Sequence, residues 1–175
     1  MAQITLAAWA LLEVGVRVWE VVRGKGRRAH DRGTRVLVAL SLGAAIGVVF
    51  ATRSAQPART AGVVVMWLGL ALRVWAIAAL GTRFRTTVEV DADQTVITTG
   101  PYRWIRHPSY AGLLLIVGGL GLALGTWLSF AAAVLIPLPA LVWRMRVEEA
   151  ELNRVLGDAY ATYQAGTARL IPRVW

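Results

Sequence analysis

Residues 110–143 read YAGLLLIVGGLGLALGTWLSFAAAVLIPLPALVW and contain no charged side chain. Two apolar segments, at about residues 110–124 and 128–143, are separated only by the link GTW. Because a link this short forces consecutive helices to turn back on one another, the stretch predicts an antiparallel helical hairpin.

Three further apolar segments precede this hairpin, at about residues 4–22, 36–51 and 61–80. A helix needs roughly 20 apolar residues to span the hydrocarbon of a bilayer, and the five segments approach or reach that length. The sequence therefore predicts an all-α fold, a polytopic membrane helical bundle with about five transmembrane helices and a C-terminal cytoplasmic helix. We expect residues 1–175 to form a single membrane domain, in which residues 1–80 supply three N-terminal transmembrane helices.

The composition also favours a membrane protein. Hydrophobic residues make up 57% of the 175 residues and charged residues only 17%, whereas soluble domains are about a quarter charged. The net charge of +9 lies mostly in short segments between apolar runs, which argues against a nucleic-acid-binding surface. The chain has no cysteine, so disulfides, thiolate metal ligands and cysteine nucleophiles are excluded, and no metal site is predicted.

Basic residues follow alternate segments, and this pattern predicts an orientation. Cytoplasmic loops of membrane proteins carry an excess of arginine and lysine. The loop between the second and third segments holds only Arg53 and Arg59, and the GTW link has no charge. We therefore predict an N-terminus outside and a C-terminus in the cytoplasm, in the inner or plasma membrane of the cell. The basic residues of the other loops are Arg23, Lys25, Arg27, Arg28, Arg32, Arg35, Arg83, Arg85, Arg103, Arg106, Arg144 and Arg146.

Two stretches are too polar to span a membrane. Residues 81–100, GTRFRTTVEVDADQTVITTG, alternate β-branched and polar residues and predict a short hairpin or an irregular loop. Residues 144–175 carry apolar side chains at helical spacing. They predict an amphipathic helix that emerges from the last apolar segment and breaks near Gly157 or Gly166.

Three polar clusters surround the hairpin. GPYRWIRHPSYAG occupies residues 100–112, Glu148 and Glu149 follow the last apolar segment, and LGDAYATY and RLIP lie nearer the C-terminus. Each cluster has an ordinary structural explanation, because proline favours the first turn of a helix and adjacent glutamates suit a solvated helix face. The functional alternative is that rigid prolines present basic and aromatic side chains to a polar ligand beside the bilayer.

Taken in this order, the motifs resemble those of the integral-membrane methyltransferases related to isoprenylcysteine carboxyl methyltransferase. The resemblance begins at LGTRFRTTVEV and runs through GPYRWIRHPSYAG, the hairpin, the Glu-Glu pair, LGDAYATY and RLIP. It covers slightly over half of the chain, and the first three segments match only in being membrane helices. It implies that residues 81–175 form a methyltransferase core with a helical hairpin and a cytoplasmic C-terminal cofactor-binding helix.

The resemblance implies S-adenosylmethionine as the cofactor, held at the cytoplasmic mouth of the bundle. No Rossmann-type G-x-G-x-x-G follows a strand, so the scaffold of soluble methyltransferases is not predicted. Adenosylmethionine offers a carboxylate, an ammonium, a sulfonium and an adenine ring, which basic, acidic and aromatic side chains can bind. Carried over to this sequence, the cofactor-binding residues are Tyr102, Arg106, His107, Pro108, Tyr110, Gly112, Glu148 and Glu149.

The same resemblance implies in-line methyl transfer to an acceptor that arrives from the bilayer, first of all the carboxylate of an isoprenylcysteine-like group. A carboxylate is already anionic and needs no general base, so positioning would dominate catalysis. Arg83, Arg85 or Arg146 would orient such a carboxylate. If the acceptor were an amine, Glu149 or His107 would act as the base. The predicted partners are a lipophilic or prenylated substrate and membrane lipids, with the oligomeric state undetermined.

Three other functions are compatible with the same motifs. The first is methyl transfer to another acceptor, the amine of a phospholipid or a small thiol. An NADPH-dependent membrane reductase of the sterol-reductase type is a second class, because its C-terminal end also resembles Y-x-x-Y…R-L-I-P. A small membrane scaffold without enzymatic activity is the third.

Overall fold

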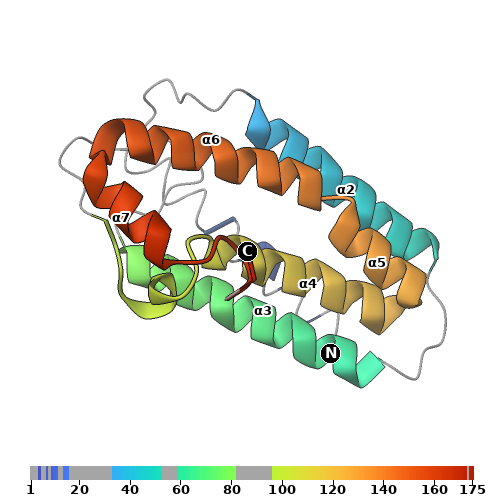
Figure 1. Ribbon diagram of the computed structural model, residues 1–175. Coiled ribbons are helices and arrows are strands. Elements are labelled where there is room, and N and C mark those ends of the chain that lie inside the picture. The colour runs from blue at the N-terminus through green and yellow to red at the C-terminus, as the bar shows by residue number, and fades with distance from the viewer. Residues whose placement is uncertain are drawn as a thin grey trace.

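The computed structural model describes residues 33–52, 59–81, 96–172 and 174–175, with a few positions between residues 4 and 15. Helices account for most of these residues and run alongside one another as a bundle (Figure 1). Within the described ranges no strand is present, and the one β-type contact is an isolated bridge, so the predicted all-α fold is confirmed. The elements are α2 (Thr34–Ala51), α3 (Arg59–Leu80), the 3₁₀ helix η2 (Gly100–Arg103), α4 (Pro108–Leu124), α5 (Trp127–Leu135), α6 (Leu138–Leu156) and α7 (Asp158–Gly166).

Four of the five predicted apolar segments correspond to described helices. Three helical stretches are long and apolar enough to cross a membrane, namely α2, α3 and the continuous run of α5 and α6. Helix α4 is equally apolar but has only 17 residues. The first predicted segment lies mostly outside the described residues, as do most of the predicted loop at residues 81–100 and, with it, Arg83 and Arg85.

The predicted hairpin is present, but its second arm is two helices rather than one. Helix α4 ends at Leu124, and α5 starts at Trp127 after a capping box between Thr126 and Ser129. Helix α5 then ends at Leu135, and α6 begins after Pro137. Proline has no N–H to donate to the preceding turn, so the helix is interrupted there. Helix α6 continues to Leu156 and carries the glutamate pair beyond the apolar stretch.

Helices α3 and α4 approach each other closely because glycines line their contact. A methyl group added at Gly69 would lie 2.6 Å from the carbonyl oxygen of Gly112, and one added at Gly112 would lie 2.7 Å from that of Gly69. Seven residues, or about two helical turns, further along, a methyl group at Gly119 would lie 2.7 Å from the carbonyl oxygen of Gly62. Small residues let helix backbones meet in membranes, where dispersion forces and hydrogen bonds replace the hydrophobic effect.

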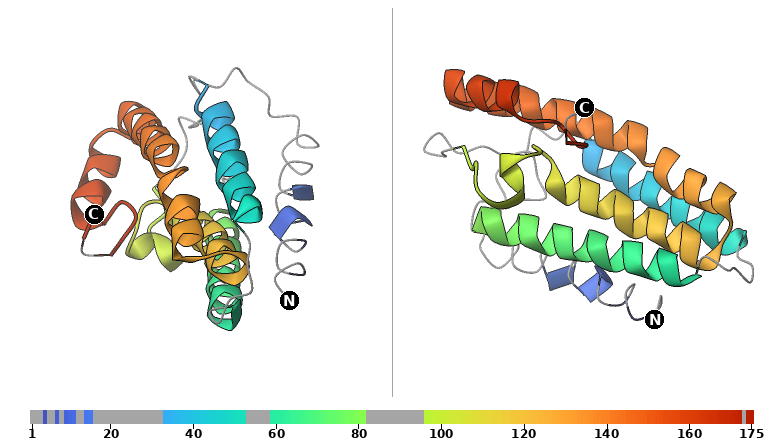
Figure 2. Two further views of the ribbon diagram at one scale, coloured as in Figure 1. Left: turned by 90° about the vertical axis from the view of Figure 1, so that its right-hand side faces the viewer. Right: turned by 60° about the horizontal axis from the view of Figure 1, so that its bottom comes forward.

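Helix α4 is central to the bundle, with α3, α5 and α2 packed against it (Figure 2). The outer faces of the surrounding helices carry large apolar side chains that are exposed, as expected where a helix faces lipid. They include Leu40 and Phe50 on α2, Trp67 and Leu68 on α3, and Trp127 and Leu128 on α5. Polar groups gather at one end of the bundle, where α3 stops and α4 begins.

Candidate functional site

The segment before α4 folds as a sequence of rigid turns. Gly100, the first residue of the short helix η2, has a φ of +60°, which favours glycine, and Pro101 follows it in the same turn. Pro108 occupies the first turn of α4, and the carbonyl of His107 accepts hydrogen bonds from the N–H groups of Tyr110 and Ala111, both at 3.1 Å. The motif therefore does form the entry to a helix, as its prolines predicted. Its polar side chains are not needed for that turn and are free to form the contacts described below.

The C-terminal strap, residues 167–172, lies along this segment. The N–H of Arg106 donates to the carbonyl of Ala168 at 2.8 Å, and the N–H of His107 donates to that of Arg169 at 3.1 Å. The N–H of Ala168 donates in return to the carbonyl of Trp104 at 3.2 Å. These bonds form the isolated parallel bridge between Ile105 and Ala168. Residues more than sixty positions apart are thereby held side by side.

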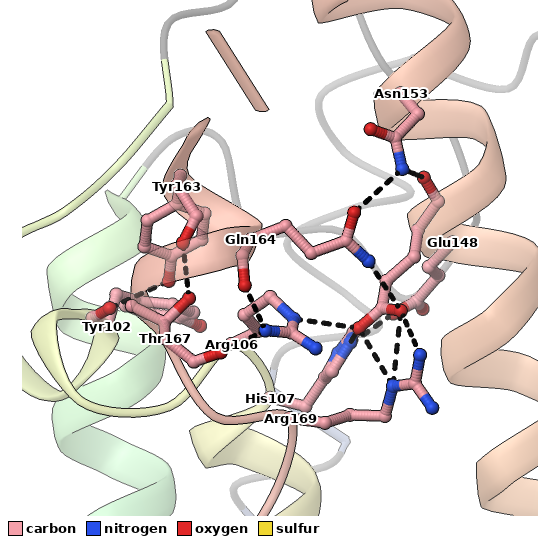
Figure 3. Close-up of polar contacts among 10 residues, drawn as sticks. Tyr102, Arg106, His107, Glu148, Asn153, Tyr163, Gln164, Thr167 and Arg169 are labelled. Carbon is pink, nitrogen blue, oxygen red and sulfur yellow. Dashed lines mark hydrogen bonds and ion pairs between the residues drawn. The ribbon is translucent and has the colours of Figure 1, made fainter. Parts of the chain in front are cut away.

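Glu149 is the centre of a buried cluster of polar side chains. Its oxygen Oε1 lies 2.9 Å from Nε of Arg106 and 3.1 Å from Nε2 of His107. Arg169 donates from Nη2 to Oε2 at 2.6 Å and from Nε to both oxygens at 3.1 Å, and Nε2 of Gln164 lies 3.3 Å from Oε2. Figure 3 shows the adjacent side chains of Arg106 and His107 meeting that of Arg169, which comes from the C-terminal strap. An ionised carboxylate has about four acceptor positions, so those of Glu149 are filled.

Arg106 also holds the end of α7. Its Nη1 donates to the carbonyl of Gln164 at 2.9 Å and to that of Thr167. A cation at the C-terminus of a helix satisfies carbonyls that have no partner within the helix and complements the helix dipole. Among the described residues Nη2 of Arg106 has no hydrogen-bond partner, so this nitrogen is available to a ligand.

A second carboxylate, Glu148, lies beside the first and is less enclosed. The hydroxyl of Tyr110 donates to Oε1 at 2.5 Å, and Nε of Arg144 lies 3.3 Å from the same atom. Within the described part of the chain, oxygen Oε2 has only a longer contact, 3.6 Å from Nδ1 of His107. The side chain of Glu148 is 19% exposed, compared with 5% for Glu149. Glu148 therefore retains an acceptor position and some access from outside.

The imidazole of His107 lies between the two glutamates and stacks on Tyr110, with ring centroids 5.6 Å apart. Arg144 extends this network to α2, because its Nη1 donates to the hydroxyl of Thr34 at 3.0 Å, and its Nε donates to the hydroxyl of Tyr110 at 2.8 Å. The cluster thus connects α2, α4, α6 and the C-terminal strap at one end of the bundle.

Tyr102 is buried and joins the network through its backbone carbonyl. The hydroxyl of Tyr163 donates to the carbonyl of Tyr102 at 2.7 Å (Figure 3). Burial raises the pKa of Tyr163 to about 12, so this hydroxyl keeps its proton and remains a donor at neutral pH. The bond fixes α7 against η2.

The sequence that forms most of this end of the bundle matches the model of a known family. The model of the isoprenylcysteine carboxyl methyltransferase family matches residues 61–154, more than half of the chain, from α3 to the polar half of α6. The chain belongs to this family. The match includes both glutamates and the segment before α4, whereas α7 and the C-terminal strap, which supply Gln164 and Arg169, lie beyond the matched residues.

Relatives and a solved structure agree with this membership. The chain is 33% identical over 113 residues to the protein-S-isoprenylcysteine O-methyltransferase of Tribolium castaneum, with 63% of this chain and 40% of the relative covered. It is 31% identical over 109 residues to the protein-S-isoprenylcysteine O-methyltransferase of Schizosaccharomyces pombe, with 61% of this chain and 46% of the relative covered. The structure of a eukaryotic intramembrane Ras methyltransferase of this family superposes with a TM-score of 0.64 at 27% identity, covering 83% of this chain and 54% of the other. The chain thus spans about half the length of these relatives.

Family membership and the apolar helices identify an integral membrane protein. The structure brings six of the sequence-predicted residues into or beside one cluster: Tyr102, Arg106, His107, Tyr110, Glu148 and Glu149. Pro108 is buried in the first turn of α4, and Gly112 packs against Gly69 of α3. Arg146 is exposed on α6 and makes no hydrogen bond to the described part of the cluster. Arg83 lies outside the described residues.

Sequence reasoning missed four side chains of this end of the family bundle. Arg169 lies within the RLIP motif and contacts Glu149, and Asn153 donates to Oε1 of Gln164 at 3.1 Å and so orients that amide. Arg73 of α3 is buried and donates from Nη1 to the hydroxyl of Ser109 at 2.7 Å. Two of the four had a signal in the sequence: Arg169 lies in a family motif, and Arg73 is a charge within an apolar helix. The amide residues Asn153 and Gln164 had no such signal.

Proposed function

We propose that this chain is an integral membrane methyltransferase that transfers a methyl group from S-adenosylmethionine to a lipophilic acceptor, the carboxylate of an isoprenylcysteine-like group. The observation that carries the proposal is the buried cluster around Glu148 and Glu149, because both glutamates and their partners His107 and Tyr110 lie inside the region matched by the family. The names of the relatives support the carboxylate acceptor, because they are protein-S-isoprenylcysteine O-methyltransferases.

Among the described residues, one cationic nitrogen and one carboxylate oxygen of the cluster have no hydrogen-bond partner, and a zwitterionic cofactor offers groups that suit both. Nη2 of Arg106 suits the carboxylate of adenosylmethionine, and Oε2 of Glu148 suits its ammonium group or ribose hydroxyls. Tyr110, stacked on His107, offers an aromatic face to the adenine or the sulfonium. Glu149 binds no additional donor without losing one of its own, so we assign it to holding Arg106 and His107 in place.

The chemistry demanded of the protein is mainly positioning. Adenosylmethionine, when bound, supplies an electrophilic methyl group on its sulfonium. A carboxylate acceptor is already ionised, so no side chain has to remove a proton. The residues of the cluster then orient the donor and exclude water, and Arg146 and Arg83 remain the predicted partners of the acceptor carboxylate. With an amine acceptor a base would be needed, and Glu149 is poorly suited because its acceptor positions are filled.

The position of the cluster fits an acceptor that arrives from the membrane. It lies at one end of the bundle, beside helices whose outer faces carry exposed apolar side chains. Arg35 and Arg103 lie near this same end, at the start of α2 and in η2, in agreement with the prediction that it faces the cytoplasm.

The direct test uses the purified full chain in detergent or nanodiscs. Calorimetry should detect binding of S-adenosylmethionine, and labelled donor should transfer its methyl group to a prenylcysteine analogue. Phosphatidylethanolamine and a small thiol are offered in parallel, since preferred methylation of either one would reassign the acceptor. Absence of donor binding at millimolar concentration, together with NADPH-dependent reduction of a lipid, would overturn the proposal in favour of a reductase.

A further inference from the structure

Arg169 is held firmly although it lies only six residues from the C-terminus. Its carbonyl accepts a hydrogen bond from the N–H of His107, and its neighbour Leu170 is buried in the same core cluster as Leu113 and Leu141. The guanidinium carbon of Arg169 lies 5.0 Å from the centre of the Trp175 ring. The backbone and the ring together aim this side chain at the interior of the cluster.

The guanidinium of Arg169 binds the carboxylate of Glu149 as a fork. Nη2 lies 2.6 Å from Oε2, and Nε lies 3.1 Å from each oxygen. Hydrogen bonds to Glu149 also raise the pKa of Arg169 above its ordinary value. A bidentate arginine sets the plane of a carboxylate, which a lysine with its single point charge does not do.

The plane of Glu149 determines where two proposed ligand-binding groups lie. Oε1 is shared by Nε of Arg106 and Nε2 of His107, so a rotation of the carboxylate would displace both. Without Arg169, Oε2 would keep only Nε2 of Gln164, at 3.3 Å. We propose that Arg169 is a positioning residue for the methyl donor, because it orients Glu149 and thereby Arg106 and His107. This inference rests on the proposed function.

The experiment measures the dissociation constant of S-adenosylmethionine in the purified full chain and in variants of Arg169. R169M keeps an unbranched side chain but removes the guanidinium, and with it the fork and the contact with Trp175. R169K keeps the charge, and R169A creates space for a small guanidinium. R154A is the matched control, because Arg154 also pairs with a glutamate, Glu151, but lies exposed on α6. Thermal midpoints are recorded for every variant.

Loss of a charge-assisted fork should weaken donor binding about tenfold or more in R169M and R169A. R169K should bind weakly too, because the defect is one of geometry, and R154A should bind like the wild type. Methylguanidinium added to R169A should restore much of the affinity, because it can bind Glu149 in place of the missing guanidinium. A purely structural role would instead make donor affinity follow the thermal midpoint across the variants.

The outcomes separate the two proposals. Wild-type affinity in R169M overturns the role of Arg169 alone, and so does a loss that methylguanidinium leaves unchanged in R169A. If R169A does not fold, the donor affinities of R169M and R169K test the proposal. Full affinity in either variant would show that the bidentate contact with Glu149 is not needed. A wild-type chain that binds no donor overturns the proposed function instead, and the inference with it.

Discussion

Two adjacent glutamates of α6 have different environments, although nothing in their local sequence distinguishes them. Glu149 points at two arginines and a histidine and is almost fully enclosed, whereas Glu148 contacts Tyr110 and Arg144 and stays partly open. Successive residues of a helix point about 100° apart, so one side chain of the pair reaches the strap and the other reaches α4. Their contributions to stability and binding should therefore differ.

Glutamine substitutions separate these contributions. E149Q removes a charge that buried cations surround, and breaking such a buried ion pair costs on the order of 3 kcal/mol of unfolding free energy. E148Q should leave the thermal midpoint nearly unchanged and weaken donor binding about tenfold. Thermal unfolding in detergent and calorimetry of S-adenosylmethionine check both. Equal midpoints for the two variants, or full donor affinity in E148Q, would contradict this division.

At the scale of elements, the contact of α3 with α4 fixes where the site begins. Gly69 and Gly112 meet at this contact, and Arg73, one turn beyond Gly69, binds Ser109 at the start of α4. The same register places His107 and Tyr110 opposite the polar half of α6. Glycine spacing along two helices thus contributes to the geometry of a site made from charged residues.

Alanine at Gly69 should disturb this contact, because its methyl group would lie within 3 Å of backbone atoms of α4. Overpacking of this kind typically costs about 1–3 kcal/mol. Gly47 of α2 is the control, since a methyl group there meets no atom within 4 Å. G69A should lower the thermal midpoint and G47A should not. A midpoint for G69A equal to that of G47A would show that the helices can separate without cost.

At the scale of the whole molecule, the polar cluster lies at the end of the bundle where α2 begins and where η2 leads into α4. The cluster combines residues of α2, α4, α6, α7 and the strap, so it exists only when these elements are assembled. The orientation of this end in the membrane is a prediction from the arginine distribution.

Labelling of single cysteines tests that orientation, because the natural chain has none and gives no background. S54C lies in the loop predicted to be outside, and T162C lies at an exposed position of α7. An impermeant maleimide should label S54C in intact cells and T162C only after lysis. The reverse pattern would place the polar cluster on the outer face and contradict a cytoplasmic donor site.

The sequence by itself determined what depends on local composition and spacing: apolar helices, the hairpin at GTW, and the family motifs. It predicted a break near Gly157 or Gly166, and the structure has the break at Gly157, with α7 ending at Gly166. It also predicted several residues of the cluster, because they lie in those motifs. It did not predict the division of α5 from α6, although Pro137 was visible. Only the tertiary structure decided that Arg169 and Gln164 bind Glu149, and that Gly112 faces α3. The physical reason is that helical periodicity is local, whereas these contacts depend on how separate elements pack together.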